Sequence, residues 1–351
     1  MKKRADGRYV KKVKLQDGTY KYFYSVASTL AKAEKDIQKQ LLEFTQKEKK
    51  GKLFSEVSDE WEEEHYKNVE YATICRYTTY VNTLNGYFQG RYIKELTAMD
   101  IEYIMNDMAI KNYSTKTIRD QLSVTKMIFH FAMIKQYIDN DVSFYIQAQK
   151  GKPSKQREPL TDTEIKIVNK SINCTFGLLA YFLLYTGLRK GELLALQWKD
   201  IDFANKLIHV YKSIYYESNK PCVKLPKTKA GVRDVILLDC LADKLKKKSD
   251  SDYVFEHDGS IIDKSYFTRQ WEKYQTETGL DITAHQLRHT YATILFEAGI
   301  KEKDAQNLMG HSDIKVTQNI YTHIRQKRMN ETANILNSFT LSNSCQNSNN
   351  H

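Results

Sequence analysis

Residues 285–323 read HQLRHTYATILFEAGIKEKDAQNLMGHSDIKVTQNIYTH, and the rest of the chain is organised around this stretch. Apolar residues recur at helical spacing over residues 291–298, and Gly299 predicts the end of that helix. A second helix is predicted to follow and to end at Gly310. The stretch therefore predicts two consecutive helices followed by a polar segment.

Four side chains in this stretch suit one kind of chemistry. His285 and Arg288 lie three residues apart, so they share one face if a helix begins here. His311 directly follows the second predicted helix, and Tyr321 lies ten residues beyond it. An arginine can clamp an anion, an imidazole can donate a hydrogen bond, and a phenol can act as a nucleophile. Together they suit attack on a phosphodiester.

Two further motifs extend the pattern over roughly the last half of the chain. Residues 186–192 read TGLRKGE, and residues 226–238 read PKTKAGVRDVILL. With the stretch quoted above, they resemble the first arginine box, the lysine hairpin and the C-terminal signature of the tyrosine recombinases, the phage-integrase family. A lone His-x-x-Arg is weak evidence, whereas three boxes in this order make a specific match.

The resemblance implies that Tyr321 cleaves DNA without a metal and forms a 3′-phosphotyrosine intermediate. The phosphotyrosine bond stores the energy of the broken DNA bond, so resealing needs no ATP. Arg189 and Arg288 are expected to hold the non-bridging phosphate oxygens as bidentate forks. Lys227 or Lys229 is expected to protonate the leaving 5′-oxygen. The family pattern favours Lys227, which precedes a threonine, and the spacing to the next arginine leaves Lys229 open.

Three further side chains complete the expected site. His285 and His311 are expected to hydrogen-bond the scissile phosphate, and His285 to assist proton removal from Tyr321. Glu192, one helical turn after Arg189, is expected to orient an arginine or a histidine rather than to touch DNA. No acidic cluster suited to Mg²⁺ accompanies the motifs, so neither a metal nor another cofactor is expected.

The composition fits a DNA-binding protein of two or three domains. The chain has 351 residues, of which 41% are hydrophobic, and its net charge of +11 favours an anionic partner such as nucleic acid. Its five cysteines form no CxxC pair and no zinc-ligand spacing, as expected in a reducing cytoplasm. The longest apolar run, residues 176–185, is about half the ~20 residues of a membrane span. The start of the chain lacks a signal-peptide core, so no membrane partner is expected.

Residues 1–52 hold most of the positive charge, with fifteen Lys and Arg against six Asp and Glu, a balance of +9. Alternating residues 9–15 and residues 20–26 predict two strands, and Ser28 or Thr29 is expected to cap a helix. A small basic sheet packed on one helix resembles the arm-site DNA-binding domains at the front of many integrases. The alternative is that the lysines only solvate a small appendage.

The expected fold class is multidomain and mainly α with small β-sheets (α+β). Residues 53–148 read as four helices in a compact bundle, at the position of the family's core-binding, SAM-like domain. The polar residues 47–52 and the basic residues 149–157 are expected to be linkers. Residues 158–338 are expected to form a mixed α/β catalytic domain, and the polar tail 339–351 to be disordered.

Local signals place several elements within these domains. Thr97 and either Ser114 or Thr115 are expected to cap bundle helices, and Thr161 with Glu164 resembles a capping box. In the catalytic domain, strands are expected at residues 207–213, 222–225 and 232–238, and helices at residues 165–172, 176–185, 189–196, 241–248 and 265–278.

The leading hypothesis is a site-specific recombinase that integrates and excises a phage or an integrative element. The basic front domain favours this over the shorter chromosome-dimer resolvases. The protein is expected to act with the nucleoid in the bacterial cytoplasm, as a homotetramer on core and arm sites of double-stranded DNA. A DNA-bending host factor and an excisionase are the expected accessory partners.

Two alternatives remain open at this point. A catalytically inactive, DNA-binding regulator on the same scaffold is one of them. Such a protein would have lost at least one of Arg189, Arg288 and Tyr321, and all three are present. A type IB topoisomerase is the other, since it would share the chemistry but would not need the basic front domain.

Overall fold

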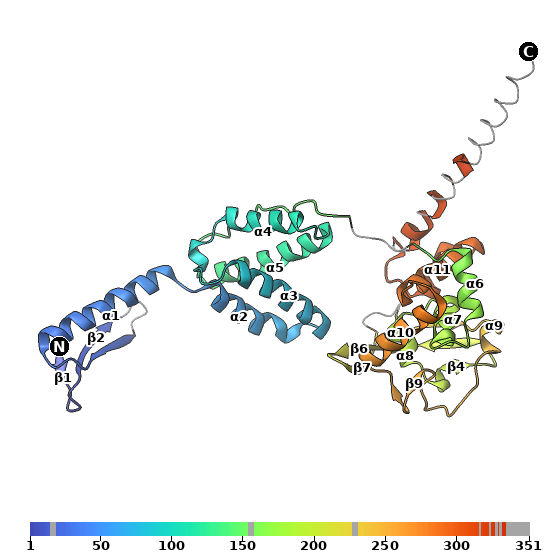
Figure 1. Ribbon diagram of the computed structural model, residues 1–351, viewed down its shortest axis with the longest axis horizontal. Helices are drawn as coiled ribbons and strands as arrows, with labels where there is room; N and C mark the ends of the chain where they lie inside the picture. The colour runs from blue at the N-terminus through green and yellow to red at the C-terminus, as the bar shows by residue number, and fades with distance from the viewer. Residues whose placement is uncertain are drawn as a thin grey trace, which may run out of the picture. The chain divides into compact units, whose positions relative to one another are not determined.

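The chain divides into two compact units, residues 1–155 and residues 156–351, called here the N-terminal and the C-terminal unit. Figure 1 follows the chain through the computed structural model. No helix of the described residues combines the length and the apolar character needed to cross a membrane. The residues that the structure describes are 1–14, 19–153, 158–226, 231–315, 317–322, 324–326, 329 and 332–334.

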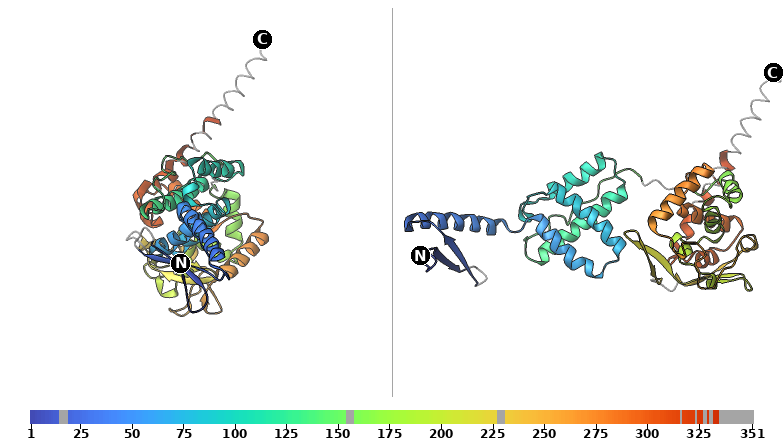
Figure 2. Two further views of the ribbon diagram at one scale, coloured as in Figure 1. Left: turned by 90° about the vertical axis from the view of Figure 1, so that its left-hand side faces the viewer. Right: turned by 60° about the horizontal axis from the view of Figure 1, so that its bottom comes forward.

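The chain begins with an antiparallel sheet covered on one face by a helix. The strands β1 (Lys2–Lys3), β2 (Tyr9–Lys14) and β3 (Tyr20–Ser25) lie in that order, and α1 (Leu30–Lys50) packs against β2 and β3 (Figure 2). Because side chains alternate along a strand, Phe23 points inward, where its ring lies 5.5 Å from that of Phe44 on α1. The predicted strands and helix are confirmed.

Three details of this region refine the predictions. Thr29, rather than Ser28, begins the helix, because its hydroxyl and its carbonyl accept from the amides of Lys32 and Ala33 at 3.4 and 3.0 Å. The expected linker at residues 47–52 is wrong in part, because α1 continues to Lys50. Lysine, glutamate and glutamine are good helix formers, and no helix breaker occurs before residue 51. The edge strand β1 was not predicted, since two lysines show no alternation.

The rest of the N-terminal unit contains the predicted bundle. Thr97 caps one of its helices in a capping box with Asp100, and Ser114 caps another by accepting from the amide of Thr117 at 3.0 Å. The described part of the bundle consists of the helices α2 (Phe54–His65), α3 (Tyr71–Tyr87), α4 (Ala98–Ile110) and α5 (Thr115–Ile134), with short 3-10 turns at Tyr66–Asn68 and Ile93–Glu95. Its core is apolar and includes Phe54, Trp61, Leu84, Ile101, Met105, Ile118, Ile128 and Phe129.

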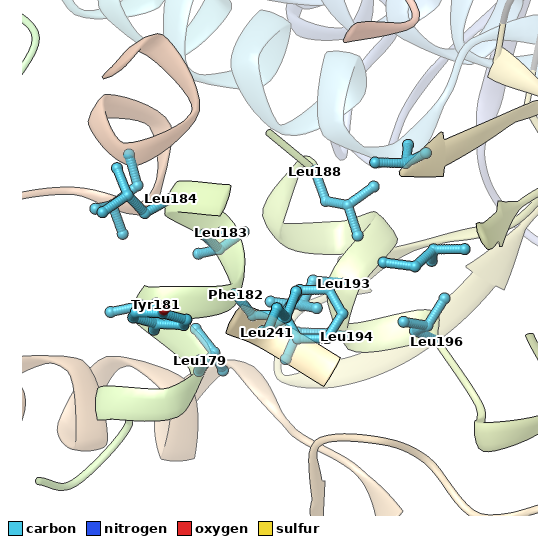
Figure 3. Close-up of a cluster of buried hydrophobic side chains, with 14 of the residues drawn as sticks. Leu179, Tyr181, Phe182, Leu183, Leu184, Leu188, Leu193, Leu194, Leu196 and Leu241 are labelled. Atoms are coloured by element: carbon cyan, nitrogen blue, oxygen red, sulfur yellow. The ribbon is translucent and has the colours of Figure 1, made fainter. Parts of the chain in front are cut away.

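The C-terminal unit is built around an almost wholly apolar helix, α7 (Gly177–Thr186), which ends at Gly187 in the left-handed conformation. Phe182 of α7 gathers with Leu193 and Leu241 in one buried cluster (Figure 3). The other helices described here are α6 (Asp162–Lys170), α8 (Lys190–Ala195), α9 (Asp239–Ala242), α10 (Lys264–Thr278), α11 (Ala284–Glu297) and α12 (Glu302–Met309), with a 3-10 turn at Trp198–Asp200.

Small antiparallel sheets complete this unit. One sheet has the order β4 (Ile201–Asp202), β5 (Leu207–Val210) and β8 (Arg233–Ile236), with Val210 paired to Arg233. The strands β6 (Ser213–Glu217) and β7 (Lys220–Lys224) form a separate hairpin, and β9 (Glu256–His257) pairs with β10 (Ser260–Ile261).

Two predictions for this unit are wrong. The strand expected at residues 207–213 is two strands, because β5 ends at Val210 and β6 begins at Ser213. The helix expected at residues 241–248 is the short α9, which ends at Ala242. Four lysines occur within residues 244–248, and like charges at helical spacing disfavour a longer helix.

Candidate active site

The first two turns of α11 carry the His-x-x-Arg pair. Thr283 caps this helix by accepting from the amide of Gln286 at 3.2 Å, so His285 and Arg288 lie in the first two turns. The helix packs against α7, and Arg288 faces this interior at 3% exposure, whereas His285 is exposed. The arginine is thus fixed by the core, while the histidine borders solvent.

Among the described residues, arginines from three elements converge on the C-terminal end of α12. They donate to three consecutive backbone carbonyls, which lack partners within the helix and carry its negative dipole end. The arginines come from α11, from the residue that caps α8, and from the start of β8. The bonds run from Arg233 Nε to Leu308 O (2.9 Å), from Arg288 Nη2 to Met309 O (2.5 Å) and from Arg189 Nη2 to Gly310 O (3.2 Å).

Glu192 joins two of these arginines. Its carboxylate accepts two bonds from the guanidinium of Arg233, at 3.1 and 2.8 Å. It also accepts from the amide and from Nη1 of Arg189, both at 2.8 Å. Burial alone would raise the pKa of Glu192, but the hydrogen bonds and charges of Arg233 and then Arg189 together outweigh it and lower the pKa to about 2. The carboxylate is therefore ionised and holds both guanidinium groups.

His311 directly follows the carbonyls that the arginines bind. Its Nδ1 lies 2.9 Å from the hydroxyl of Thr317, and its backbone amide donates to Gln306 O at 3.2 Å. Burial and then the charges of Arg288 and Arg189 lower its pKa to about 4. The same causes lower the pKa of His285. Both imidazoles are therefore neutral near pH 7.

Tyr321 lies in a helical segment beyond His311 and is 2% exposed. Its hydroxyl donates to Ile300 O at 3.2 Å, and its ring meets Phe296 edge-on at 5.0 Å. Burial and then the charge of Glu302 raise its pKa. Within the described residues, the hydroxyl thus bonds to the turn between α11 and α12 and not to an arginine.

The structure brings Arg189, Glu192, Arg288 and His311 together around the end of α12, while Tyr321 packs nearby on the α11–α12 turn. Lys227 and Lys229 lie outside the described residues. Within the part of the chain that the structure describes, no group of three or more His, Cys, Asp or Glu side chains could hold a metal ion.

Sequence reasoning missed Arg233 as a member of this cluster. It lies inside the quoted motif at residues 226–238, but a charged residue at the start of a strand reads as exposed. In the structure its side chain is only 6% exposed. The sequence did hold one signal for its burial, because this arginine lies beside apolar, β-like residues. An arginine that is buried among such residues needs an acidic partner.

Comparisons with known proteins identify the family. Residues 154–328 match the phage integrase family, and residues 53–109 match the phage integrase N-terminal SAM-like domain. A tyrosine recombinase XerC-like protein of Caldanaerobacter subterraneus subsp. tengcongensis is 31% identical over 297 residues, which cover 74% of this chain and 75% of that protein.

Two solved structures have a similar fold. The Tn1549 transposon integrase in complex with a circular intermediate DNA has a TM-score of 0.64 and 22% identity, covering 79% of this chain and 99% of that chain. A lambda integrase tetramer bound to a Holliday junction has a TM-score of 0.60 and 17% identity, covering 90% and 93%. From the family match and the XerC-like relative, this chain belongs to the tyrosine recombinase (phage integrase) family and is a site-specific DNA recombinase.

Proposed function

We propose that this recombinase is an integrase that cuts and rejoins double-stranded DNA through a 3′-phosphotyrosine bond at Tyr321. The reaction would integrate or excise a phage or an integrative element. The observation that carries the proposal is the convergence of Arg189, Arg288 and His311 at the end of α12, with Tyr321 ten residues beyond His311.

The two arginines would hold the phosphate. A guanidinium has five N–H donors in a planar fork. Arg288 uses two of them, on Gly187 O and Met309 O, and Arg189 uses two, on Glu192 and Gly310 O. The fixed carbonyls orient both planes before DNA arrives, and Glu192 also holds that of Arg189. Further N–H donors can then meet the non-bridging oxygens, where charge grows in the pentacoordinate transition state. Such preorganised donors cost no reorganisation during the reaction.

The histidines and a lysine would donate hydrogen bonds to the phosphate and transfer protons. If the Thr317 hydroxyl donates to Nδ1 of His311, then Nε2 carries the proton and can donate to the phosphate. His285, neutral and at the solvent border, would take the proton of Tyr321. Lys227, or alternatively Lys229, would protonate the leaving 5′-oxygen. For Tyr321 to attack, its hydroxyl must exchange the carbonyl of the α11–α12 turn for the phosphate.

We further propose that residues 1–52 bind a second DNA sequence, the arm site. Three tyrosines, Tyr20, Tyr22 and Tyr24, lie on the sheet face opposite α1 and are 52%, 48% and 37% exposed. Lys12 lies 3.7 Å from the ring centre of Tyr20, and Arg8 lies 5.4 Å from that of Tyr24. Cations interleaved with polar aromatic rings on a narrow sheet suit phosphate and base-edge contacts in a groove.

The assembly would be a homotetramer on DNA in the bacterial cytoplasm, aided by a DNA-bending host factor and an excisionase. The tetrameric lambda integrase on a Holliday junction supports this, as does the basic front domain. Deleting residues 1–52 tests the arm assignment. The shortened chain should cleave core-site DNA but lose integration, and unchanged integration would refute the assignment.

A nicked suicide substrate tests the central reaction, because the short cleaved product diffuses away and traps the covalent adduct. The wild-type chain should form the adduct in EDTA, and Tyr321→Phe should not. Tyr103→Phe is the matched control, because Tyr103 is 64% exposed on the bundle helix α4. Binding without an adduct would favour the inactive regulator. Relaxation of supercoiled DNA without strand exchange would favour the topoisomerase.

A further inference from the structure

We propose that Arg233 is a positioning residue, which fixes Arg189 through Glu192 and fixes the turn before His311 through the end of α12. This inference rests on the proposed function of the Arg189, Arg288 and His311 cluster. Arg233 itself would touch neither the phosphate nor the nucleophile.

The first contact is a two-bond fork onto Glu192. Arg233 Nη1 and Nη2 donate to the two carboxylate oxygens at 3.1 and 2.8 Å, and both side chains are buried, at 6% and 7% exposure. The same two oxygens accept from the amide and from Nη1 of Arg189, each at 2.8 Å. A shift of Arg233 therefore moves the carboxylate that sets the plane of Arg189.

The second contact is with the end of α12. Nε of Arg233 donates to Leu308 O at 2.9 Å. The guanidinium also packs beneath Gly310, where an added Cβ would lie 2.8 Å from Nη1 and 2.9 Å from Cζ. Gly310 in turn presents its carbonyl to Arg189 and precedes His311. Arg233 thus touches both the partner of Arg189 and the turn that carries His311.

Only an arginine can make all three bonds at once. The planar fork meets the carboxylate edge with two nitrogens, while Nε points to the carbonyl at a fixed angle. A lysine keeps the charge but has a single nitrogen, so it must lose the fork or the carbonyl bond. Arg233→Lys should therefore loosen the geometry of Arg189 while leaving Glu192 paired with a cation.

The test measures single-turnover formation of the covalent adduct on saturating, pre-bound suicide substrate. Arg233→Lys should form the adduct about tenfold to a hundredfold more slowly, because displacements near 1 Å cost about that much in rate. DNA affinity in a gel shift should stay within about threefold of wild type, because Arg233 touches no phosphate and phosphate contacts supply most of the affinity. Arg233→Gln should form the adduct more slowly still. If Arg233→Gln fails to fold, the result for Arg233→Lys alone decides the test.

A matched variant separates positioning from stability. Asp200→Asn breaks another buried ion pair of the same unit, between Asp200 and Lys212, whose side chains are 2% and 12% exposed. It should lower the unfolding midpoint, yet leave the rate of adduct formation per folded molecule unchanged. A merely structural Arg233 would behave in the same way.

Two outcomes would overturn the inference. One is a wild-type rate for folded Arg233→Lys. The other is that Asp200→Asn, against expectation, slows adduct formation per folded molecule as much as Arg233→Lys does. In both, the wild-type chain still forms the adduct, so the proposed function stands. A wild-type chain that forms no adduct would instead refute the proposed function itself.

Discussion

Gly310→Ala is expected to damage both the stability of the C-terminal unit and its cleavage rate, and Gly299→Ala is its matched control. Both glycines follow a helix and lie in the left-handed region, at φ values of +62° and +74°. They differ in surroundings, because a Cβ on Gly299 meets nothing within 4 Å, whereas one on Gly310 meets the guanidinium of Arg233 at 2.8 Å. The pair therefore isolates the packing against Arg233.

The magnitudes follow from these two differences. A left-handed conformation costs an alanine about 1–2 kcal/mol, and both variants carry this term. Overpacking adds about 1–3 kcal/mol when the neighbour cannot move freely. Three hydrogen bonds, to Glu192 and Leu308, hold the Arg233 guanidinium in place. Gly310→Ala should therefore destabilise the unit by about 1–3 kcal/mol more than Gly299→Ala.

Hydrogen-exchange mass spectrometry along a urea titration measures this difference. Peptides from the C-terminal unit report its unfolding separately from that of the bundle, so a multidomain transition is not misread as a single one. Gly310→Ala should also slow adduct formation, whereas Gly299→Ala should retain nearly the wild-type rate per folded molecule. Equal losses of stability and rate in the two variants would refute the close packing of Arg233 beneath Gly310.

Three further predictions address the chemistry of the site. Arg189→Lys and Arg288→Lys should each cut the single-turnover cleavage rate by about 10²–10³-fold with little loss of gel-shift affinity, because an ammonium cannot form the fork. If either variant binds poorly but cleaves normally, the arginine it replaces is a simple DNA contact. In an NMR titration of the free protein, His311 should stay neutral at pH 7 and take up a proton only as the pH falls towards about 4. A titration midpoint near 6.5, the ordinary value for histidine, would contradict the buried site flanked by arginines. A substrate with sulfur in place of the 5′-oxygen has a leaving group that needs no proton. It should therefore restore cleavage by the alanine variant of whichever lysine, Lys227 or Lys229, is the general acid. If it restores cleavage by neither variant, neither lysine has that role.

Local chemistry made much of the fold predictable from the sequence. Thr97 and Thr161 carry an acidic residue three positions later, and both form the capping boxes that this spacing favours. Gly187 ends α7 because it adopts a left-handed conformation without a steric cost. Such signals need only a few neighbouring residues, which is why these helix ends could be predicted.

Tertiary partners decided what the sequence could not predict. The burial of Arg233 depends on Glu192, which lies 41 positions earlier in the chain. The strands β9 and β10 have two residues each, too few for any periodicity. The contact of the Tyr321 hydroxyl with Ile300 O likewise follows from how the helices pack, although the tyrosine itself was identifiable from its motif.

The most direct test of the central claim is to locate the covalent bond on the trapped protein. Trypsin should release residues 316–325, VTQNIYTHIR, in which Tyr321 is the single tyrosine. Mass spectrometry of the digested adduct should find this peptide joined to the 3′-phosphate of the cleaved strand. A nucleotide attached to any other peptide, or attached to this one through a 5′-phosphate, would contradict the account.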